Sequence, residues 1–137
     1  MSKLYLPEPD SADFVQKAAN NPVIVTTRLA LYEMRRVAFR KESDGYIRAG
    51  TAESVLTQLN LDIAAGQIRV VDLDARVETE FKVIMASCYR HAPPLPVRTF
   101  DTLHLASCRA EGQSELVATD KRMRDAAKLL GLSLFPA

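Results

Sequence analysis

Short apolar runs alternate along this chain with longer segments in which apolar residues recur every three or four positions. The runs are rich in β-branched residues and predict strands, whereas the periodic segments predict helices with one buried face. The predicted strands cover residues 23–26, 68–71, 116–119 and 132–135. Helices are predicted for residues 11–19, 28–41, 51–65, 99–110 and 121–130, with one more that follows Asp74 and extends at least to Cys88.

This alternation of strands and helices predicts an α/β fold with a short parallel sheet covered on both faces. Only four strands are predicted, and residues 1–6 at the start of the chain have a helix-like composition. A three-layer α/β/α domain would therefore lack a central strand. Next to the strands at 23–26 and 116–119 we expect an edge of unpaired backbone, which is an association hazard.

Polar side chains stand at or just before the starts of four of the predicted helices and can cap the free backbone N–H groups of the first turn. These residues are Thr27, Asp74, Thr99 and Asp120. Asp101 follows in the first turn of the helix at 99–110, where the helix dipole favours a negative charge. Leu105 and Cys108 lie on the same side of this helix, so the carboxylate heads an apolar stripe. A charge at the head of an apolar stripe needs a partner, for example a metal ion. Alternatively, Asp101 interacts only with the helix dipole and binds no ligand.

Two further acids have a similar setting. Asp120 comes directly after the strand at 116–119, which reads as buried, and ligands of open α/β sheets bind outside the carboxyl ends of the strands. Asp120 could instead be only the N-cap of the next helix. Glu33 falls within an apolar stripe and is predicted to point toward the core side; it could instead reach solvent or pair with Arg28 or Arg36. The stripe consists of Ala30, Met34, Val37 and Ala38.

Composition restricts the classes of function that remain. The chain has 137 residues, 47% of them apolar, and is expected to form one domain over residues 1–137. With a net charge of +1, no strong overall field favours nucleic acid or membrane. The two cysteines have no metal-ligand spacing and are expected to be reduced thiols of a cytoplasmic protein. No membrane span or signal peptide is expected, and no Gly-rich phosphate loop, zinc pattern or Gly-x-Ser-x-Gly elbow is present.

Four stretches resemble the successive signature stretches of PIN-domain proteins. They are KLYLPEP at 3–9, TRLALYE at 27–33, FDTLHLA at 100–106 and ATDKRM at 118–123, and they are similar to VapC-type toxins of bacterial and archaeal toxin–antitoxin pairs. The resemblance implies a three-layer PIN-like fold and a Mg²⁺-dependent (or Mn²⁺-dependent) endoribonuclease. Glu33, Asp101 and Asp120 would hold the metal or orient the attacking water. The implied partners are RNA, a small antitoxin and a second copy of the chain.

The sequence departs from the family pattern at its start. PIN domains of this group open with a central strand that ends in an aspartate followed by Thr and Ser, and neither that strand nor that aspartate is present. Either the true protein is longer by about one strand, which we favour, or the chain is a degenerate form with an impaired metal site. In the second case it would be a module that only binds antitoxin or RNA, or a structural remnant.

Basic residues supply candidate contacts for RNA. Lys121 and Arg122 lie beside Asp120 and are placed to meet phosphates, as is Arg98. The helix at 28–41 has a charge-rich end that is either a solvated face or a contact for RNA or antitoxin. This end consists of Arg35, Arg36, Arg40 and Lys41.

Overall fold

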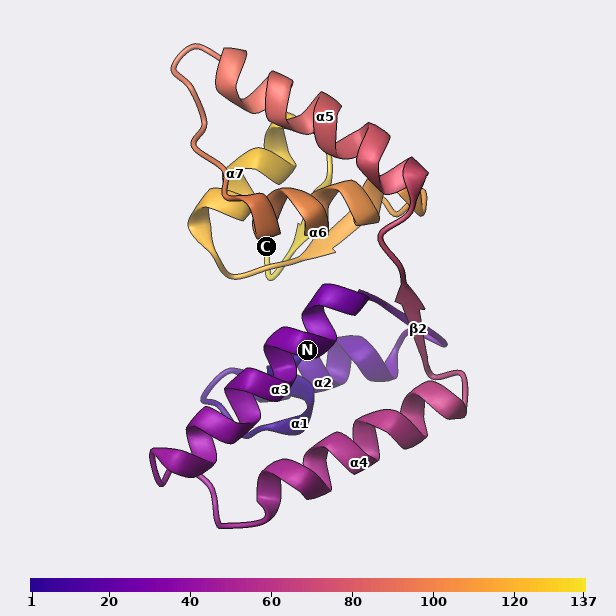
Figure 1. The fold of residues 1–137 in the computed structure, drawn as a ribbon, viewed down its shortest axis with the longest axis vertical. Helices are drawn as coiled ribbons and strands as arrows, with labels where there is room; N and C mark the ends of the chain where they lie inside the picture. Colours follow the sequence, from indigo (N-terminus) through magenta and orange to yellow (C-terminus); the bar gives the residue numbers. More distant parts are fainter. The chain divides into compact units, whose positions relative to one another are not determined.

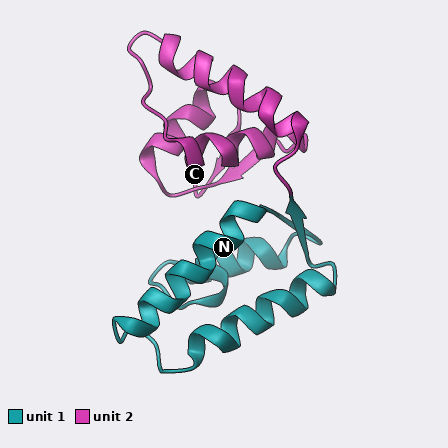
Figure 2. Cartoon of the chain, viewed as in Figure 1, with its two compact units in different colours: residues 1–71 teal, residues 72–137 magenta.

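The computed structural model describes all 137 residues and divides into two compact units, residues 1–71 and residues 72–137 (Figure 1, Figure 2). Unit 1 contains four helices and one pair of parallel strands. In chain order its elements are α1 (Ser2–Tyr5), α2 (Ser11–Ala19), β1 (Ile24–Thr27), α3 (Arg28–Ser43), α4 (Thr51–Ala64) and β2 (Ile68–Val71). Strand β1 pairs with β2 in a register that runs from Ile24 opposite Ile68 to Thr27 opposite Val71.

The core of unit 1 lies where α3 and α4 pack against each other and against the start of the chain. Both helices bury an apolar stripe, and Leu6, next to Pro7 at the end of α1, is 1% exposed. The buried cluster consists of Leu6, Leu31, Met34, Ala38, Ala52, Leu56, Leu59 and Ile68. The hydroxyl of Thr27 caps α3 by accepting a hydrogen bond of 2.9 Å from the Ala30 N–H, as predicted.

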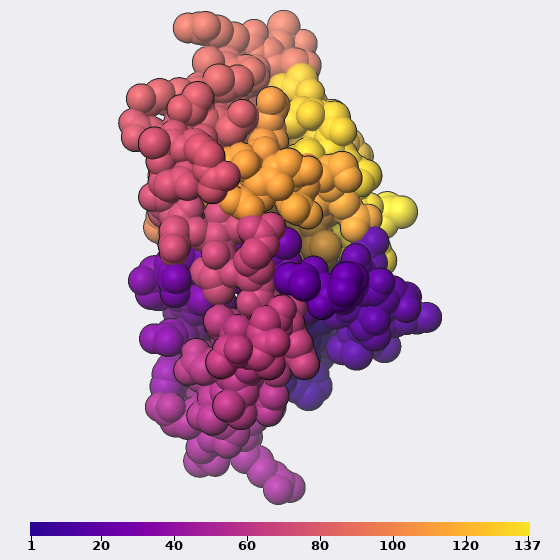
Figure 3. Space-filling view, turned by 90° about the vertical axis from the view of Figure 1, so that its right-hand side faces the viewer, coloured from indigo at the N-terminus to yellow at the C-terminus, as the bar shows by residue number.

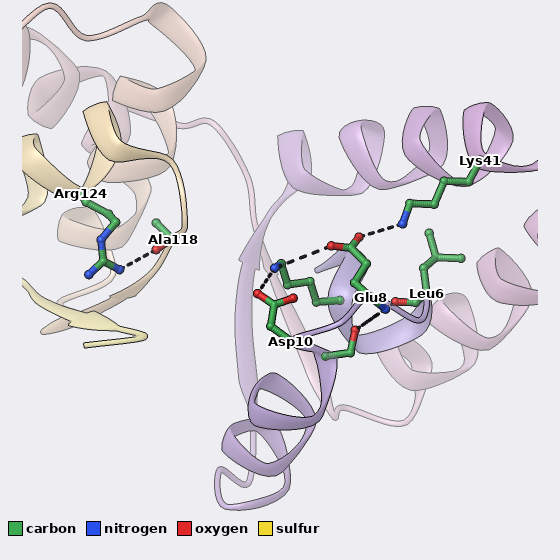
Figure 4. Close-up of polar contacts among 8 residues, drawn as sticks. Leu6, Glu8, Asp10, Lys41, Ala118 and Arg124 are labelled. Atoms are coloured by element: carbon green, nitrogen blue, oxygen red, sulfur yellow. Dashed lines mark hydrogen bonds and ion pairs between the residues drawn. The ribbon is translucent and has the colours of Figure 1, made fainter. Parts of the chain in front are cut away.

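Charged side chains tie α1 and the segment after it to α3 (Figure 4). The Lys41 ammonium lies 3.0 Å from a Glu8 oxygen, and Lys3 contacts the carboxylates of both Glu8 and Asp10. The Lys3 ammonium also lies 4.9 Å from the centre of the Phe14 ring. Because three of these ionic groups are only about a quarter exposed or less, the network fixes the first ten residues against the helix that carries Glu33.

Unit 2 contains three helices and a second pair of parallel strands. Its elements are α5 (Ala75–Arg90), α6 (Thr99–Ala110), β3 (Glu115–Val117), α7 (Lys121–Leu129) and β4 (Ser133–Phe135). Helices α5 and α6 pack along much of their length, and their surfaces adjoin in Figure 3. Ile84 and Cys88 of α5 and Leu105 of α6 are fully buried.

Two buried hydroxyls in α6 are satisfied within the helix itself. Thr102 donates to the Arg98 carbonyl at 2.9 Å, and Ser107 donates to the Leu103 carbonyl at 2.8 Å. This back-bonding lets polar residues line a helix face that is otherwise apolar. Both cysteines are free thiols, and burial raises the pKa of Cys88 and of Cys108.

The structure confirms the α/β fold class and the predicted order of helices and strands. Its four strands form two separate parallel pairs rather than one sheet. Within its own unit each of the strands β1 and β3 pairs with a single neighbour, and the unpaired edge expected next to them stays a prediction.

Two local predictions are wrong. The third strand ends at Val117 and is largely exposed, whereas residues 116–119 read as a buried strand. Thr99 does not cap α6, because the helix already includes it and Arg98 occupies the N-cap position. The Thr102 N–H donates to the Arg98 carbonyl at 2.9 Å, which starts the helical hydrogen bonding one residue earlier than predicted.

Candidate metal centre

Asp101 is a half-buried carboxylate without a protein partner. It lies in the first turn of α6, whose N-cap residue makes no side-chain capping bond. No hydrogen bond or ion pair reaches the Asp101 carboxylate from the protein. The free N–H groups of the first turn and the helix dipole favour a negative charge here. All the lone pairs of this carboxylate are therefore available to an external ligand such as a cation.

Asp120 lies between β3 and α7 and caps that helix. Its Oδ1 accepts a hydrogen bond of 3.1 Å from the Met123 N–H, and the side chain is exposed. The predicted capping role is thus confirmed. A carboxylate can cap a helix with one oxygen and still present the other to solvent, so Asp120 keeps one oxygen for a ligand.

Glu33 does not point toward the core, contrary to the prediction. It is exposed, and the buried residues of α3 are Leu31, Met34 and Ala38. The prediction left out Leu31, which moves the centre of the buried face away from position 33. Glu33 lies close enough to the N-terminus to act on the Met1 ammonium: burial lowers the pKa of that group, and the charge of Glu33 opposes the shift.

The family model described as PIN domain matches residues 1–129. The chain belongs to the PIN-domain family. The match spans residues of both units, and it includes all three acids considered above. PIN domains are generally nucleases and typically use divalent metal ions. None of the curated proteins matches the chain.

The donors in this PIN domain suit a hard divalent cation. Mg²⁺ is held by one or two carboxylates together with waters and substrate phosphates, and needs no complete protein cage. Asp101 and Asp120 lie in one unit, at the starts of two helices that contact each other and that begin on the same side of the unit in Figure 1. Neither unit by itself gathers three acidic, histidine or cysteine side chains around one point. Glu33 belongs to the other unit, so its convergence with the two aspartates stays a prediction.

The cations predicted to meet phosphate have different surroundings in this PIN domain. Arg98 and Arg122 are exposed. Lys121 is exposed as well, but its ammonium lies 2.7 Å from an Asp125 oxygen, which neutralises part of its charge. Among the three, Arg98 and Arg122 are therefore better suited to an anionic ligand. No helix of the structure has both the length and the apolar character that crossing a membrane requires.

Sequence reasoning missed Arg124, which fixes the strand ends next to Asp120. Its Nη1 donates to the Ala118 carbonyl at 2.9 Å and to the Pro136 carbonyl at 2.7 Å, and so joins the segments that follow β3 and β4 (Figure 4 shows the first bond). The one signal in the sequence was the position of Arg124, four residues after the capping Asp120. The two carbonyl groups that Arg124 binds come together only in the folded unit, so the sequence could not show this contact.

We expect Arg124→Met to lower the free energy of unfolding by about 2 kcal/mol, because two carbonyl groups lose a charged donor. Methionine keeps the helix propensity and much of the apolar contact of arginine. The matched control is Arg122→Met, which removes an exposed arginine from the same helix and should change stability by less than about 0.5 kcal/mol. Urea denaturation followed by circular dichroism measures both, and equal effects of the two substitutions would show that Arg124 does not hold the strand ends together.

Proposed function

We propose that this PIN domain is a Mg²⁺-dependent (or Mn²⁺-dependent) endoribonuclease and the toxin of a VapC-type toxin–antitoxin pair. The observation that carries the proposal is the half-buried Asp101 carboxylate, which has no protein partner in a family of metal-dependent nucleases. The two units together would form one domain over residues 1–137. The family match across both units supports this.

In the proposed mechanism Asp101, Asp120 and Glu33 would hold the cation. When bound, Mg²⁺ supplies charge neutralisation and a water of lowered pKa for attack on phosphorus. The Asp120 oxygen that is not used for capping and the unpartnered Asp101 carboxylate are the ligands offered by unit 2. Arg98, Lys121 and Arg122 would contact the phosphates of the substrate and orient the strand at the acids.

The proposed partners are an RNA substrate, an antitoxin that covers the acids, and a second copy of the chain. A cytoplasmic location agrees with two free thiols and with a substrate found in that compartment. The engagement of Asp120 as a helix cap favours an alternative, in which the chain is a catalytically impaired PIN module that only binds antitoxin or RNA.

The test is cleavage of a labelled single-stranded RNA by the purified full chain. We expect cleavage with Mg²⁺ or Mn²⁺, and loss of cleavage when a chelator removes the metal. The chelator reaction needs a readdition control, in which excess Mg²⁺ restores activity. Cleavage that persists in chelator would contradict the metal mechanism. RNA binding without cleavage at any metal concentration would favour the impaired module instead.

A further inference from the structure

Helix α3 carries aromatic and arginine side chains on the face opposite its buried stripe. We call this surface the outer face of α3, and it consists of Tyr32, Arg35, Arg36, Phe39 and Arg40. All five residues are exposed; Tyr32 is 60% and Phe39 is 46% exposed. Residues three, four and seven positions apart share one side of a helix, so the two rings lie in line, about 10 Å apart along the axis, with arginines between and beside them.

The arrangement is not explained by the stability of α3. Basic residues favour a helix C-terminus, which accounts for Arg40 and Lys41 in the last turn. Arg35 and Arg36 lie in the middle of a helix that spans residues 28–43, where the helix dipole does not stabilise a positive charge. No carboxylate forms an ion pair with Arg35, Arg36 or Arg40. The large exposed rings likewise contribute little to the core formed by the opposite face.

We propose that the outer face of α3 binds single-stranded RNA. Bases would stack on Tyr32 and Phe39, and phosphates would contact the arginines. Proteins that bind single strands without sequence preference combine these two features, since every base has a π-face and every linkage carries a charge. The proposal rests on the proposed function, because that function supplies RNA as the ligand.

Charge complementarity favours a polyanion over a second copy of the chain. A two-fold interface places the same patch on both partners, so the outer face of α3 would bring three unpaired arginines against three others. Such like-charge contact is costly across an interface. Two acids of α3 lie close to this face. Glu33 is exposed, three residues before Arg36, and has contacts of its own, and Glu42 caps α4 by accepting a hydrogen bond of 2.8 Å from the Ala52 N–H.

The experiment measures the affinity of the full chain for a fluorescently labelled single-stranded oligoribonucleotide in chelator, so that binding is read without cleavage. The triple variant Arg35→Gln/Arg36→Gln/Arg40→Gln should weaken binding at least tenfold. It should also reduce the slope of log K against log salt by about 2, because each phosphate contact on a single strand contributes about 0.7. Glutamine keeps the helix propensity of arginine.

The matched control removes the same charge elsewhere, with Lys82→Gln/Arg90→Gln/Lys128→Gln at exposed positions of unit 2. Its affinity should change less than twofold and its salt slope by less than 0.5. A second pair tests stacking: Tyr32→Leu should weaken binding about tenfold, whereas Tyr32→Phe keeps the ring and should bind as the unaltered chain does. Circular dichroism confirms that each variant is folded.

Equal affinity and slope for the two triple variants would overturn the proposal. So would a change of sedimentation from dimer to monomer in the α3 triple variant with unchanged RNA affinity, which would make this face a self-association surface. The outcome for RNA binding by this face can be distinguished from the outcome for the proposed nuclease activity. RNA that binds through this face but is never cut refutes only the nuclease, and RNA that is cut equally well by the α3 triple variant, with unchanged affinity, refutes only the face.

Discussion

Asp101→Asn is expected to reduce Mg²⁺-dependent cleavage of RNA by at least about 100-fold, because the loss of a metal ligand removes several kcal/mol of transition-state stabilisation. Asparagine has the same size and shape, and Asp101 accepts no hydrogen bond from the protein that the change would break. The fold should therefore tolerate the substitution. Initial rates at saturating Mg²⁺ measure the effect, and a Mn²⁺ titration should show weaker metal binding independently of turnover.

The matched control for this variant is Asp13→Asn. Asp13 is an exposed acid in the first turn of α2, so its substitution removes a favourable dipole interaction from a helix start without touching the candidate metal centre. Each substitution should cost less than about 1 kcal/mol of stability. If Asp101 served only the helix dipole, the two variants would cleave RNA at equal rates, and that outcome would remove Asp101 from the site.

Helices were predicted well because their signal is local and repeated. The periodicity of α3 and α4 and the capping residues Thr27 and Asp74 lie within a few positions of the element that they define. The bounds of α2 and β2 agree with the prediction at both ends. Gly66, with a φ of +77°, ends α4 as expected from the freedom of glycine in the left-handed region.

Strand burial was harder to predict because it depends on contacts from distant segments. Residues 116–119 are apolar enough for a buried strand, yet β3 pairs only with β4 and leaves Val117 51% exposed. A strand with one neighbour keeps much of its surface in solvent.

The same difference between local and long-range signals decides which residues of the candidate site could be predicted. Asp101 and Asp120 could be found from their positions at helix starts, because the dipole and the capping geometry are properties of the local chain. The face of Glu33 was predicted wrongly because one buried leucine, Leu31, was omitted from a stripe of four residues. Arg124 was missed because its two carbonyl partners come from segments 6 and 12 residues away.

Leu105→Ala is expected to lower the free energy of unfolding by about 3 kcal/mol. Leu105 is fully buried in α6, and a truncated leucine in a close-packed core loses its transfer energy and leaves a cavity. The midpoint of thermal unfolding should fall by about 10 °C for a chain of this size. Urea denaturation and thermal circular dichroism measure the two quantities.

Leu61→Ala supplies the matched control, since it makes the same chemical change in α4 at a position that is 57% exposed. Both substitutions raise helix propensity equally, so the difference between them isolates burial. The control should shift stability by less than about 0.5 kcal/mol. Equal shifts would mean that α6 is not packed as the structure has it.

Because Leu105 lies one turn after Asp101 on the same side of α6, its packing also fixes the first turn that presents the carboxylate. Leu105→Ala should therefore lower RNA cleavage even below its own melting temperature, whereas Leu61→Ala should not.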